Sequence, residues 1–325
     1  MENLEEFKDK LQSTKNILLL THVNPDGDTL SSALALYLAL KDNYQYLKID
    51  ITYTSKIPDI YMFLPNISEF QNIEEIDKNK IYDMAIALDV AAKDRMVYGL
   101  KLYEKSKIKI NIDHHKTNNK YGDINIIKSD YASCSQVVFD ILKYLNINIK
   151  KEYATAIYTG LLTDTGGFRY ENTDFKVLSL ASKLIEYGAD PYLISKACYE
   201  SKDKAQVLLH SYCILNSVFY DELSLVYTVI TKETMEKFKA QDQHTEGLVE
   251  KLRQINTIDI AIVLKEISDH CTKISLRSKT KDVSKIASYF NGGGHKFASG
   301  CTIKKNYKSA ILDLIDIIRK YNIKG

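Results

Sequence analysis

Short apolar runs alternate with helical spacings of apolar residues along the first half of the chain. Runs of the kind found in buried parallel strands predict strands at 17–20, 47–54, 81–88 and 107–112. Apolar residues three and four positions apart predict helices at 3–13, 29–40, 133–145, 153–162 and 179–187. Strands that alternate with helices are typical of a parallel sheet that is covered by helices on both faces.

The alternation starts again after residue 222 and predicts a second, smaller α/β domain. Its expected strands and helices lie at 223–230, 247–255, 258–267, 273–277, 283–290 and 309–321. Gly188 followed by Pro191 is a normal end of a helix, so we place a linker at about 188–200. The predicted organisation is a doubly wound, mostly parallel N-terminal domain at 1–190, a linker with a connecting helix at 191–218, and a C-terminal domain at 219–325.

Acidic and imidazole side chains follow three of the predicted strands directly. His22, Asp26 and Asp28 come after 17–20, Asp89 follows 81–88, and 107–112 ends on the Asp113-His114-His115 triplet. Ligands of open α/β sheets bind at the carboxyl ends of the strands, so these side chains are expected to meet there. A surface carboxylate has no reason to recur at that edge, and the repetition therefore favours a functional site.

Four carboxylates and two imidazoles form the candidate metal ligands: His22, Asp26, Asp28, Asp89, His114 and Asp164. Two divalent ions with a bridging carboxylate need about six protein ligands. This mixture suits Mn²⁺ better than Mg²⁺, which prefers oxygen ligands, and Zn²⁺ stays open with fewer ligands. Two such ions activate water and neutralise phosphoryl oxygens, so phosphoester hydrolysis fits best. Taken singly, these residues could instead be helix caps or turn residues.

A glycine run in the predicted second domain suggests a contact with an anion. Gly292, Gly293 and Gly294 precede His295 and Lys296, and the backbone N–H groups of such a run can form a concavity that binds anions. Arg277 is a candidate fork for a phosphate. A flexible loop is the alternative for the glycines alone, and the metal motifs favour the binding interpretation.

Composition limits the classes of protein to which the chain could belong. A net charge of +2 over 325 residues argues against a protein that coats long nucleic acids. Five scattered cysteines without a paired motif indicate reduced thiols. The acidic, amphipathic N-terminus does not resemble a signal peptide, and no apolar stretch is long enough to cross a membrane. We therefore predict a cytoplasmic protein without a membrane partner.

The motifs together resemble those of the DHH phosphoesterase superfamily. The resemblance rests on His-Val-Asn-Pro-Asp-Gly-Asp at 22–28, Asp89, Asp113-His114-His115, and Leu-Leu-Thr-Asp-Thr-Gly at 161–166. Gly-Gly-Gly-His-Lys-Phe-Ala-Ser-Gly at 292–300, with Ser-Leu-Arg-Ser at 275–278, resembles the C-terminal domain associated with that superfamily. The two-domain layout is similar to the bacterial nano-RNase and pAp phosphatase group, in which we expect an active-site cleft between the domains.

The resemblance also implies roles for individual residues. His22 and Asp26 would hold one manganese ion together with Asp89, which bridges to the second. The second ion would be completed by three further side chains, Asp28, His114 and Asp164. Asp113 would orient its neighbours, and His115 would contact the scissile phosphate and protonate the leaving oxygen. The substrate would be bound by residues of the second domain, namely Arg277, Gly293, Gly294 and His295.

The implied activity is degradation of very short RNA or DNA oligonucleotides and of linear dinucleotides such as pApA, with pAp as a further substrate. Two Mn²⁺ ions are the expected cofactors, with Mg²⁺ or Co²⁺ as substitutes. The alternatives are an exonuclease of the RecJ type, an inorganic pyrophosphatase, and a regulatory protein that binds nucleotides without catalysis. The oligomeric state stays open, with a homodimer among the alternatives.

Overall fold

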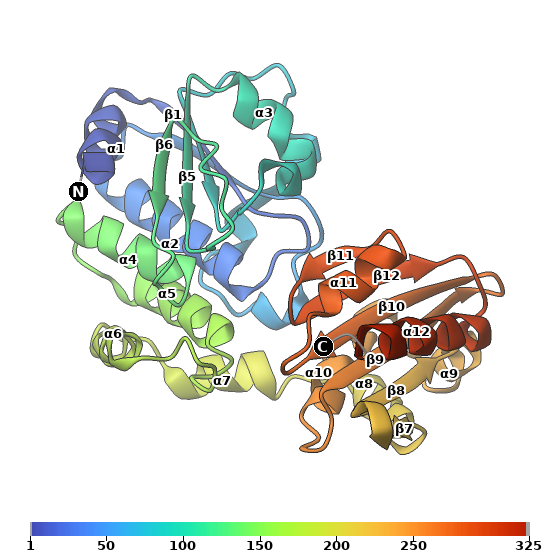
Figure 1. Ribbon diagram of the computed structural model, residues 1–325. Helices are drawn as coiled ribbons and strands as arrows, with labels where there is room; N and C mark the ends of the chain where they lie inside the picture. The colour runs from blue at the N-terminus through green and yellow to red at the C-terminus, as the bar shows by residue number, and fades with distance from the viewer. Residues whose placement is uncertain (1, 323–325) are drawn as a thin grey trace. The chain divides into compact units, whose positions relative to one another are not determined.

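The computed structural model describes residues 2–322, which divide into two compact units between Ser201 and Lys202 (Figure 1). The first unit contains a six-stranded sheet with the order β3-β2-β1-β4-β5-β6, and all of its strand pairs are parallel. Its strands are β1 (Asn16–Leu20), β2 (Lys48–Tyr53), β3 (Phe70–Asn72), β4 (Met84–Leu88), β5 (Ile108–Asp113) and β6 (Ile124–Ile127).

Both faces of this sheet are buried, as the continuous apolar runs predict. On β1, Ile17 and Leu19 pack into the larger core, and Leu18 and Leu20 into the smaller core on the other face. The larger core includes α2 (Gly27–Asn43), α4 (Cys134–Tyr144), α5 (Lys151–Asp164) and α6 (Phe175–Glu186), and the smaller core includes α3 (Leu100–Lys105). The predicted doubly wound α/β fold is therefore confirmed.

The strand order brings the three motif-bearing strands together. Strand β4 lies between β1 and β5, with Leu20 opposite Ala87 and Leu88 opposite Ile112. Because all three strands run in the same direction, their carboxyl ends meet at one edge of the sheet. The loops that follow β1, β4 and β5 consequently start side by side.

The second unit contains a mixed sheet with the order β11-β12-β10-β9-β8-β7, in which only β8 and β9 are parallel within the described chain. Its strands are β7 (Val218–Tyr220), β8 (Leu225–Ile230), β9 (Ile260–Ser268), β10 (Cys271–Ser278), β11 (Gly293–His295) and β12 (Ala298–Ile303). Helices α11 (Val283–Tyr289) and α12 (Tyr307–Asn322) cover one face. Helices α8 (Lys204–Leu215), α9 (Lys232–Lys237) and α10 (Leu248–Arg253) contribute to the core on the other.

The segment predicted as a linker at 188–200 contains a helix instead. Helix α7 (Pro191–Tyr199) has Pro191 in its first turn, and the Asp190 carboxylate caps it by accepting a hydrogen bond from the Leu193 amide at 3.0 Å. Proline is as favourable at the start of a helix as it is after the end of one, and the sequence pattern alone did not separate the two cases. Ile194 is buried and anchors α7 in the core of the first unit.

The short α1 helix (Glu2–Ser13) packs Phe7 and Leu11 into the larger core of the first unit. Among residues 2–322, no helix combines the length and the apolar character that a membrane span requires.

Candidate metal centre

The Asp89 carboxylate stands between two groups of metal-ligating side chains at the carboxyl edge of the parallel sheet. Its Oδ2 lies 3.7 Å from Nε2 of His22, and its Oδ1 lies 3.4 Å from Nε2 of His114. Asp89 adopts a left-handed backbone conformation with φ of 60°, which aspartate tolerates better than most residues. One carboxylate therefore faces both groups.

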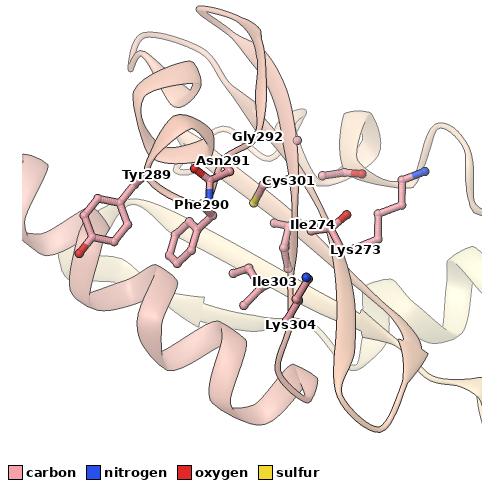
Figure 2. Close-up of a pocket in the computed structure, with 12 residues that line it drawn as sticks. Lys273, Ile274, Tyr289, Phe290, Asn291, Gly292, Cys301, Ile303 and Lys304 are labelled. Carbon is pink, nitrogen blue, oxygen red and sulfur yellow. The ribbon is translucent and has the colours of Figure 1, made fainter.

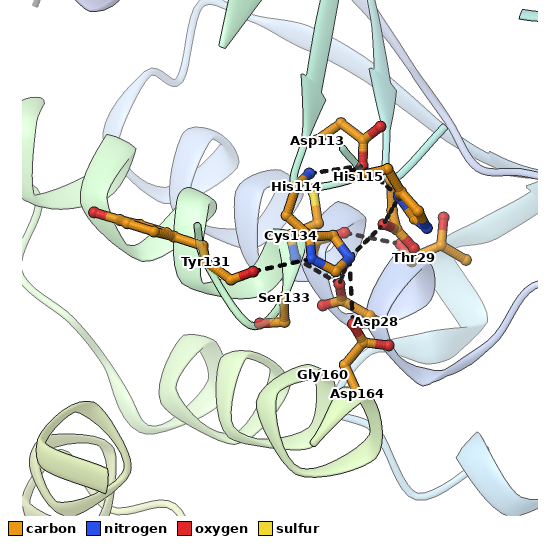
Figure 3. Close-up of polar contacts among 12 residues, drawn as sticks. Asp28, Thr29, Asp113, His114, His115, Tyr131, Ser133, Cys134, Gly160 and Asp164 are labelled. Atoms are coloured by element: carbon orange, nitrogen blue, oxygen red, sulfur yellow. Dashed lines mark hydrogen bonds and ion pairs between the residues drawn. The ribbon is translucent and has the colours of Figure 1, made fainter. Parts of the chain in front are cut away.

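The two groups consist of the six residues predicted from the sequence. In the first, Nε2 of His22 lies 3.6 Å from Oδ1 of Asp26. In the second, Nε2 of His114 lies 3.2 Å from Oδ2 of Asp164 and 3.8 Å from Oδ2 of Asp28 (Figure 3). In each group the potential ligand atoms lie within 4.8 Å of one another, which is compact enough to hold one ion.

The loop between β1 and α2 carries three of these residues in a fixed geometry. Asp26 caps α2 by accepting hydrogen bonds from the backbone amides of Asp28 and Thr29, at 3.2 and 3.1 Å. Asp28 is buried in the first turn of α2, where its carboxylate accepts hydrogen bonds from Ser135 Oγ at 2.6 Å and from the amides of Cys134 and Ser135. The start of α4 thus orients Asp28 through charge-assisted hydrogen bonds.

Backbone carbonyls fix the two histidine rings in the orientation that a metal ligand requires. Nδ1 of His22 lies 2.9 Å from the Val23 carbonyl, and Nδ1 of His114 lies 3.2 Å from the Tyr131 carbonyl. A carbonyl can only accept a hydrogen bond, so these contacts place the proton on Nδ1 and the lone pair on Nε2 in the neutral rings. Both Nε2 atoms face the carboxylates, as in many sites where a second partner orients a metal-bound histidine.

The pKa values reflect strong coupling among these buried charges. Burial lowers the pKa of His22 and of His114, but the neighbouring carboxylates outweigh burial and raise each value to about 10. Burial and the charge of Asp89 raise the pKa of Asp28 to about 7. Burial also raises the pKa of Asp164 well above its usual range. The charge of Asp89 therefore disfavours ionisation of both Asp28 and Asp164.

The donor set fits divalent cations. Oδ1 of Asp89 is buried and has no hydrogen-bond partner among residues 2–322, although buried carboxylate oxygens are normally paired. It faces the second group, where a cation would satisfy it and would offset the repulsion among the converging carboxylates. The mixture of oxygen and imidazole donors suits a divalent transition metal.

Asp113 and His115 lie beside this centre and form a pair. Nδ1 of His115 lies 2.8 Å from Oδ1 of Asp113, which is buried and also accepts hydrogen bonds from the His114 and His115 amides. Burial lowers the pKa of His115, but Asp113 and Asp89 outweigh burial and raise it. The His115 side chain is 35% exposed, so its Nε2 can reach a ligand while Nδ1 is held.

The second unit aligns the predicted substrate-binding residues along neighbouring strands. Ala298 on β12 is opposite both Arg277 on β10 and His295 on β11. The His295 side chain lies outside the described part of the structure. Gly294, with φ of 136°, packs so closely on β12 that an added Cβ would lie 2.6 Å from the Ala298 carbonyl, whereas the space beside Gly293 is open.

Two cavities lie in the second unit. One of about 880 Å³ is lined by Asn291, Gly292 and Cys301, among others (Figure 2). Arg277 lines the other, of about 480 Å³, where its Nε donates to Oε1 of Glu250 at 2.9 Å. Part of the guanidinium is therefore already paired, which the sequence did not predict.

Comparison with known proteins identifies the family. Residues 16–161 match the model of the DHH family, N-terminal domain, and residues 222–322 match that of the DHHA1 domain. The bifunctional oligoribonuclease and PAP phosphatase NrnA of Thermus thermophilus is 31% identical over 294 residues, which cover 89% of this chain and 84% of that protein. The chain belongs to the DHH family. The resemblance inferred from the motifs is confirmed.

Other DHH-family relatives agree over most of their length. NrnA of Bacillus subtilis, which has the same description, is 29% identical to this chain. The alignment covers 88% of this chain and 89% of the Bacillus protein. A solved structure of an exopolyphosphatase-related protein from Bacteroides fragilis superimposes with a TM-score of 0.92 at 27% identity, over 98% of this chain and 96% of that one. The predicted hydrolase class is confirmed by these relatives.

Three residues at the DHH centre were given no role from the sequence. Ser135 binds Asp28, Asn118 donates to Asp113, and Arg95 has Nη2 3.3 Å from Nδ1 of His22. Asn118 lies five positions after Asp113, and that short spacing was a usable signal. Ser135 is 107 positions from Asp28, so their contact depends on how α2 and α4 pack.

Proposed function

We propose that this chain is a manganese-dependent phosphohydrolase that degrades very short oligonucleotides and linear dinucleotides to mononucleotides and also removes the 3′-phosphate from pAp. The observation that carries the proposal is the Asp89 carboxylate facing two compact histidine and aspartate groups. The substrate class is supported by the two NrnA relatives, which are described as oligoribonucleases and PAP phosphatases.

The proposed ligands of the first ion are His22, Asp26 and Asp89, and the second ion adds Asp28, His114 and Asp164. Two bound divalent ions would supply an activated water and neutralise charge on the phosphoryl oxygens. Mn²⁺ matches the mixed oxygen and imidazole donors, and Mg²⁺ or Co²⁺ could substitute for it. Before ions bind, His22 and His114 must lose their protons. The neighbouring carboxylates oppose this loss because they raise the pKa of both imidazoles.

His115 is the proposed acid that protonates the leaving oxygen. Asp113 holds Nδ1 of the ring and raises the pKa of His115, which favours the protonated ring. The partly exposed ring can turn only a little while Nδ1 stays bonded, so Nε2 is the atom that delivers the proton.

Residues of the second unit are the proposed contacts to the rest of the substrate. Arg277 retains Nη2 for a phosphate while Nε binds Glu250. The open space beside Gly293 lets a ligand approach the backbone closely, and His295 lies two residues further along the same strand. A near-neutral net charge favours short substrates, since long strands reward an extended basic track. The cytoplasmic location stays a prediction.

The decisive experiment compares Mn²⁺-dependent turnover of pApA, pAp, a long 5′-labelled RNA and pyrophosphate. We expect rapid loss of pApA, slow loss of the long RNA, and release of phosphate from pAp. Preference for the long RNA would indicate a single-strand exonuclease instead, and turnover of pyrophosphate alone would indicate a pyrophosphatase. Absence of turnover for all four would contradict the proposal.

Variants test the proposed roles in the same assay. Asp89→Ala removes the carboxylate that faces both ion sites, so turnover should fall by more than the ~10–100-fold that follows loss of an outer-sphere partner. Arg277→Ala should mainly raise KM. Asp94→Asn changes an exposed carboxylate close to Asp89 in sequence and should behave as wild type. Equal kcat values for wild type and Asp89→Ala would exclude the assigned centre.

A further inference from the structure

Arg95 brings a cationic side chain against one of the proposed metal ligands. It lies in the turn η4 (Lys93–Gly99), which follows β4 and Asp89. Its Nη2 is 3.3 Å from Nδ1 of His22 and 3.4 Å from the Val23 carbonyl, while its own carbonyl accepts a hydrogen bond from the Val23 amide at 2.9 Å. The turn and the loop after β1 are therefore joined at this point.

The contact with His22 leaves most of the guanidinium donors uncommitted. Nδ1 of His22 is closer to the Val23 carbonyl, at 2.9 Å, and donates its proton there if Nε2 is the ligand atom. A protonated Nδ1 cannot accept a hydrogen bond from Arg95. The guanidinium, which carries five N–H donors, is then bonded within the described structure only through the long contact to the Val23 carbonyl.

A nearby lysine shows what an ordinary surface cation does in the same turn. Nζ of Lys93 lies 2.7 Å from Oε1 of Glu104, so its charge is paired. Arg95 is exposed and makes its side-chain contacts with His22 and Val23 instead. A cation held close to a divalent-ion site is repelled by the ions unless an anion lies between them. The arrangement therefore calls for an anionic group of the substrate.

The turn that carries Arg95 contains an unusual backbone conformation. Val97, two residues later, has φ of 47° and ψ of −109°, a conformation that branched side chains rarely adopt. Gly99 closes the turn against β1, since an added Cβ there would lie 2.7 Å from Leu20 Cδ2. Strain of this kind persists where the surroundings impose it, and it concentrates at functional sites.

The reach of Arg95 limits which phosphates it can bind. An ion on Nε2 of His22 would lie at most ~8 Å from Nη2, allowing for the ring and a metal–nitrogen bond of about 2.1 Å. That reach includes the phosphate next to the one that the ions bind, and this next phosphate has no other proposed partner in the first unit. In pApA and pAp alike, the nucleoside that carries the scissile phosphate at its 3′ oxygen carries a second phosphate at its 5′ oxygen.

We propose that Arg95 binds this non-scissile 5′-phosphate and selects substrates that carry one. The inference rests on the proposed function and adds a binding residue from the first unit to it. Arginine suits the task because its planar donors match two phosphate oxygens at once. Substrates without a 5′-phosphate, such as ApA and 3′-AMP, lose this contact.

The test compares Arg95→Met with the matched variant Lys93→Met on pApA and ApA. Arg95→Met should lower kcat/KM for pApA by about 10–100-fold, which corresponds to loss of a hydrogen bond to a charged group. Turnover of ApA and the affinity for Mn²⁺, measured by electron paramagnetic resonance, should change less than about twofold. Arg95→Lys should recover part of the loss, and Lys93→Met should match wild type.

Binding of pApA and ApA by calorimetry, with Ca²⁺ in place of Mn²⁺, gives a second readout that needs no turnover. Weaker binding of pApA alone by Arg95→Met supports the inference even if hydrolysis is absent and the proposed function fails. An equal loss for both dinucleotides, or a fall in Mn²⁺ affinity, would show that Arg95 acts through His22 and would overturn it. Unchanged discrimination in Arg95→Met would overturn it as well.

Discussion

Oδ1 of Asp113 lies 2.8 Å from Nδ1 of His115, inside a network that leaves this carboxylate fully buried. The same oxygen accepts hydrogen bonds from the amides of His114 and His115, and Asn118 donates to Oδ2. The carboxylate is thereby fixed where it orients one imidazole and supports its proton. A buried, negatively charged partner of this kind sets the protonation state of His115.

Asp113→Asn should move the pH dependence of turnover. Asp113 raises the pKa of His115, so removing its charge lowers that pKa, and His115 loses its proton at a lower pH. The alkaline limb of the kcat profile should therefore shift to lower pH, and kcat near pH 8 should fall by about 10–100-fold. An alkaline limb that stays in place would argue against His115 as the acid. Asp94→Asn is the control for an exposed carboxylate.

Affinity for Mn²⁺ should rise as pH rises. The carboxylates raise the pKa values of His22 and His114 to about 10, so protons compete with the ion for both imidazoles at neutral pH. Since a ligand must be deprotonated to bind, affinity should increase by up to about tenfold per pH unit for each imidazole between about pH 6 and about pH 9. Titration calorimetry in buffers of different ionisation enthalpy should detect the released protons.

His270→Gln provides the comparison, because His270 is an exposed residue of the second unit. This variant should retain the same pH dependence of Mn²⁺ affinity as wild type. Affinity that does not change with pH would contradict the assignment of His22 and His114 as ligands.

Gly160→Ala should destabilise the first unit, although alanine normally stabilises a helix by about 1 kcal/mol relative to glycine. An added Cβ on α5 would lie 1.9 Å from Ser135 Oγ and 2.6 Å from Oδ1 of Asp28. Relieving these contacts should cost about 1–3 kcal/mol and should disturb the hydrogen bond that orients Asp28. Urea unfolding and Mn²⁺ titration should show lower stability and weaker binding together.

Thr155→Ala is the matched change on the same helix, at a position that is only partly buried. It should leave Mn²⁺ affinity unchanged and alter stability by only a few tenths of a kcal/mol. If Gly160→Ala were as stable as Thr155→Ala, this result would contradict the close packing of α5 against Asp28.

The second unit should lose stability as pH falls because of His210. This side chain is 1% exposed, and its Nδ1 has no hydrogen-bond partner among residues 2–322. Burial, with the charges of Lys251 and Lys202, lowers its pKa to about 4, whereas the unfolded value is about 6.5. Below pH 6.5 the unfolded chain therefore binds a proton that the folded chain does not, and the free energy of unfolding falls as pH falls towards 4.

His210→Gln should remove this dependence while keeping a donor for the His244 carbonyl, which His210 Nε2 contacts at 2.9 Å. Between pH 7 and about pH 5, wild type should lose on the order of 2 kcal/mol more than the variant in urea unfolding of the full chain. His270→Gln should follow wild type. Equal pH slopes for wild type and His210→Gln would show that His210 is not held neutral.

Local sequence was sufficient for much of the fold and for the identities of the candidate ligands. The strands β1, β4 and β5 are buried on both faces, so their sequences are continuous apolar runs that stand out without any partner. His22, Asp26 and Asp28 follow one strand within eight residues, and Asp113, His114 and His115 are consecutive. Chemistry concentrated at strand ends can therefore be predicted from neighbouring positions alone.

Contacts between distant segments depended on the tertiary structure. The order β1-β4-β5 places Asp89 between His22 and His114, and the packing of α2 against α4 and α5 brings Ser135 and Gly160 to Asp28. The contact of Arg95 with His22 and the contact of Glu250 with Arg277 likewise depend on how separate elements pack. Residue type and the local hydrophobic period indicate which side chains carry chemistry. Strand order, register and helix packing decide which of these side chains meet, because they are properties of the whole folded chain.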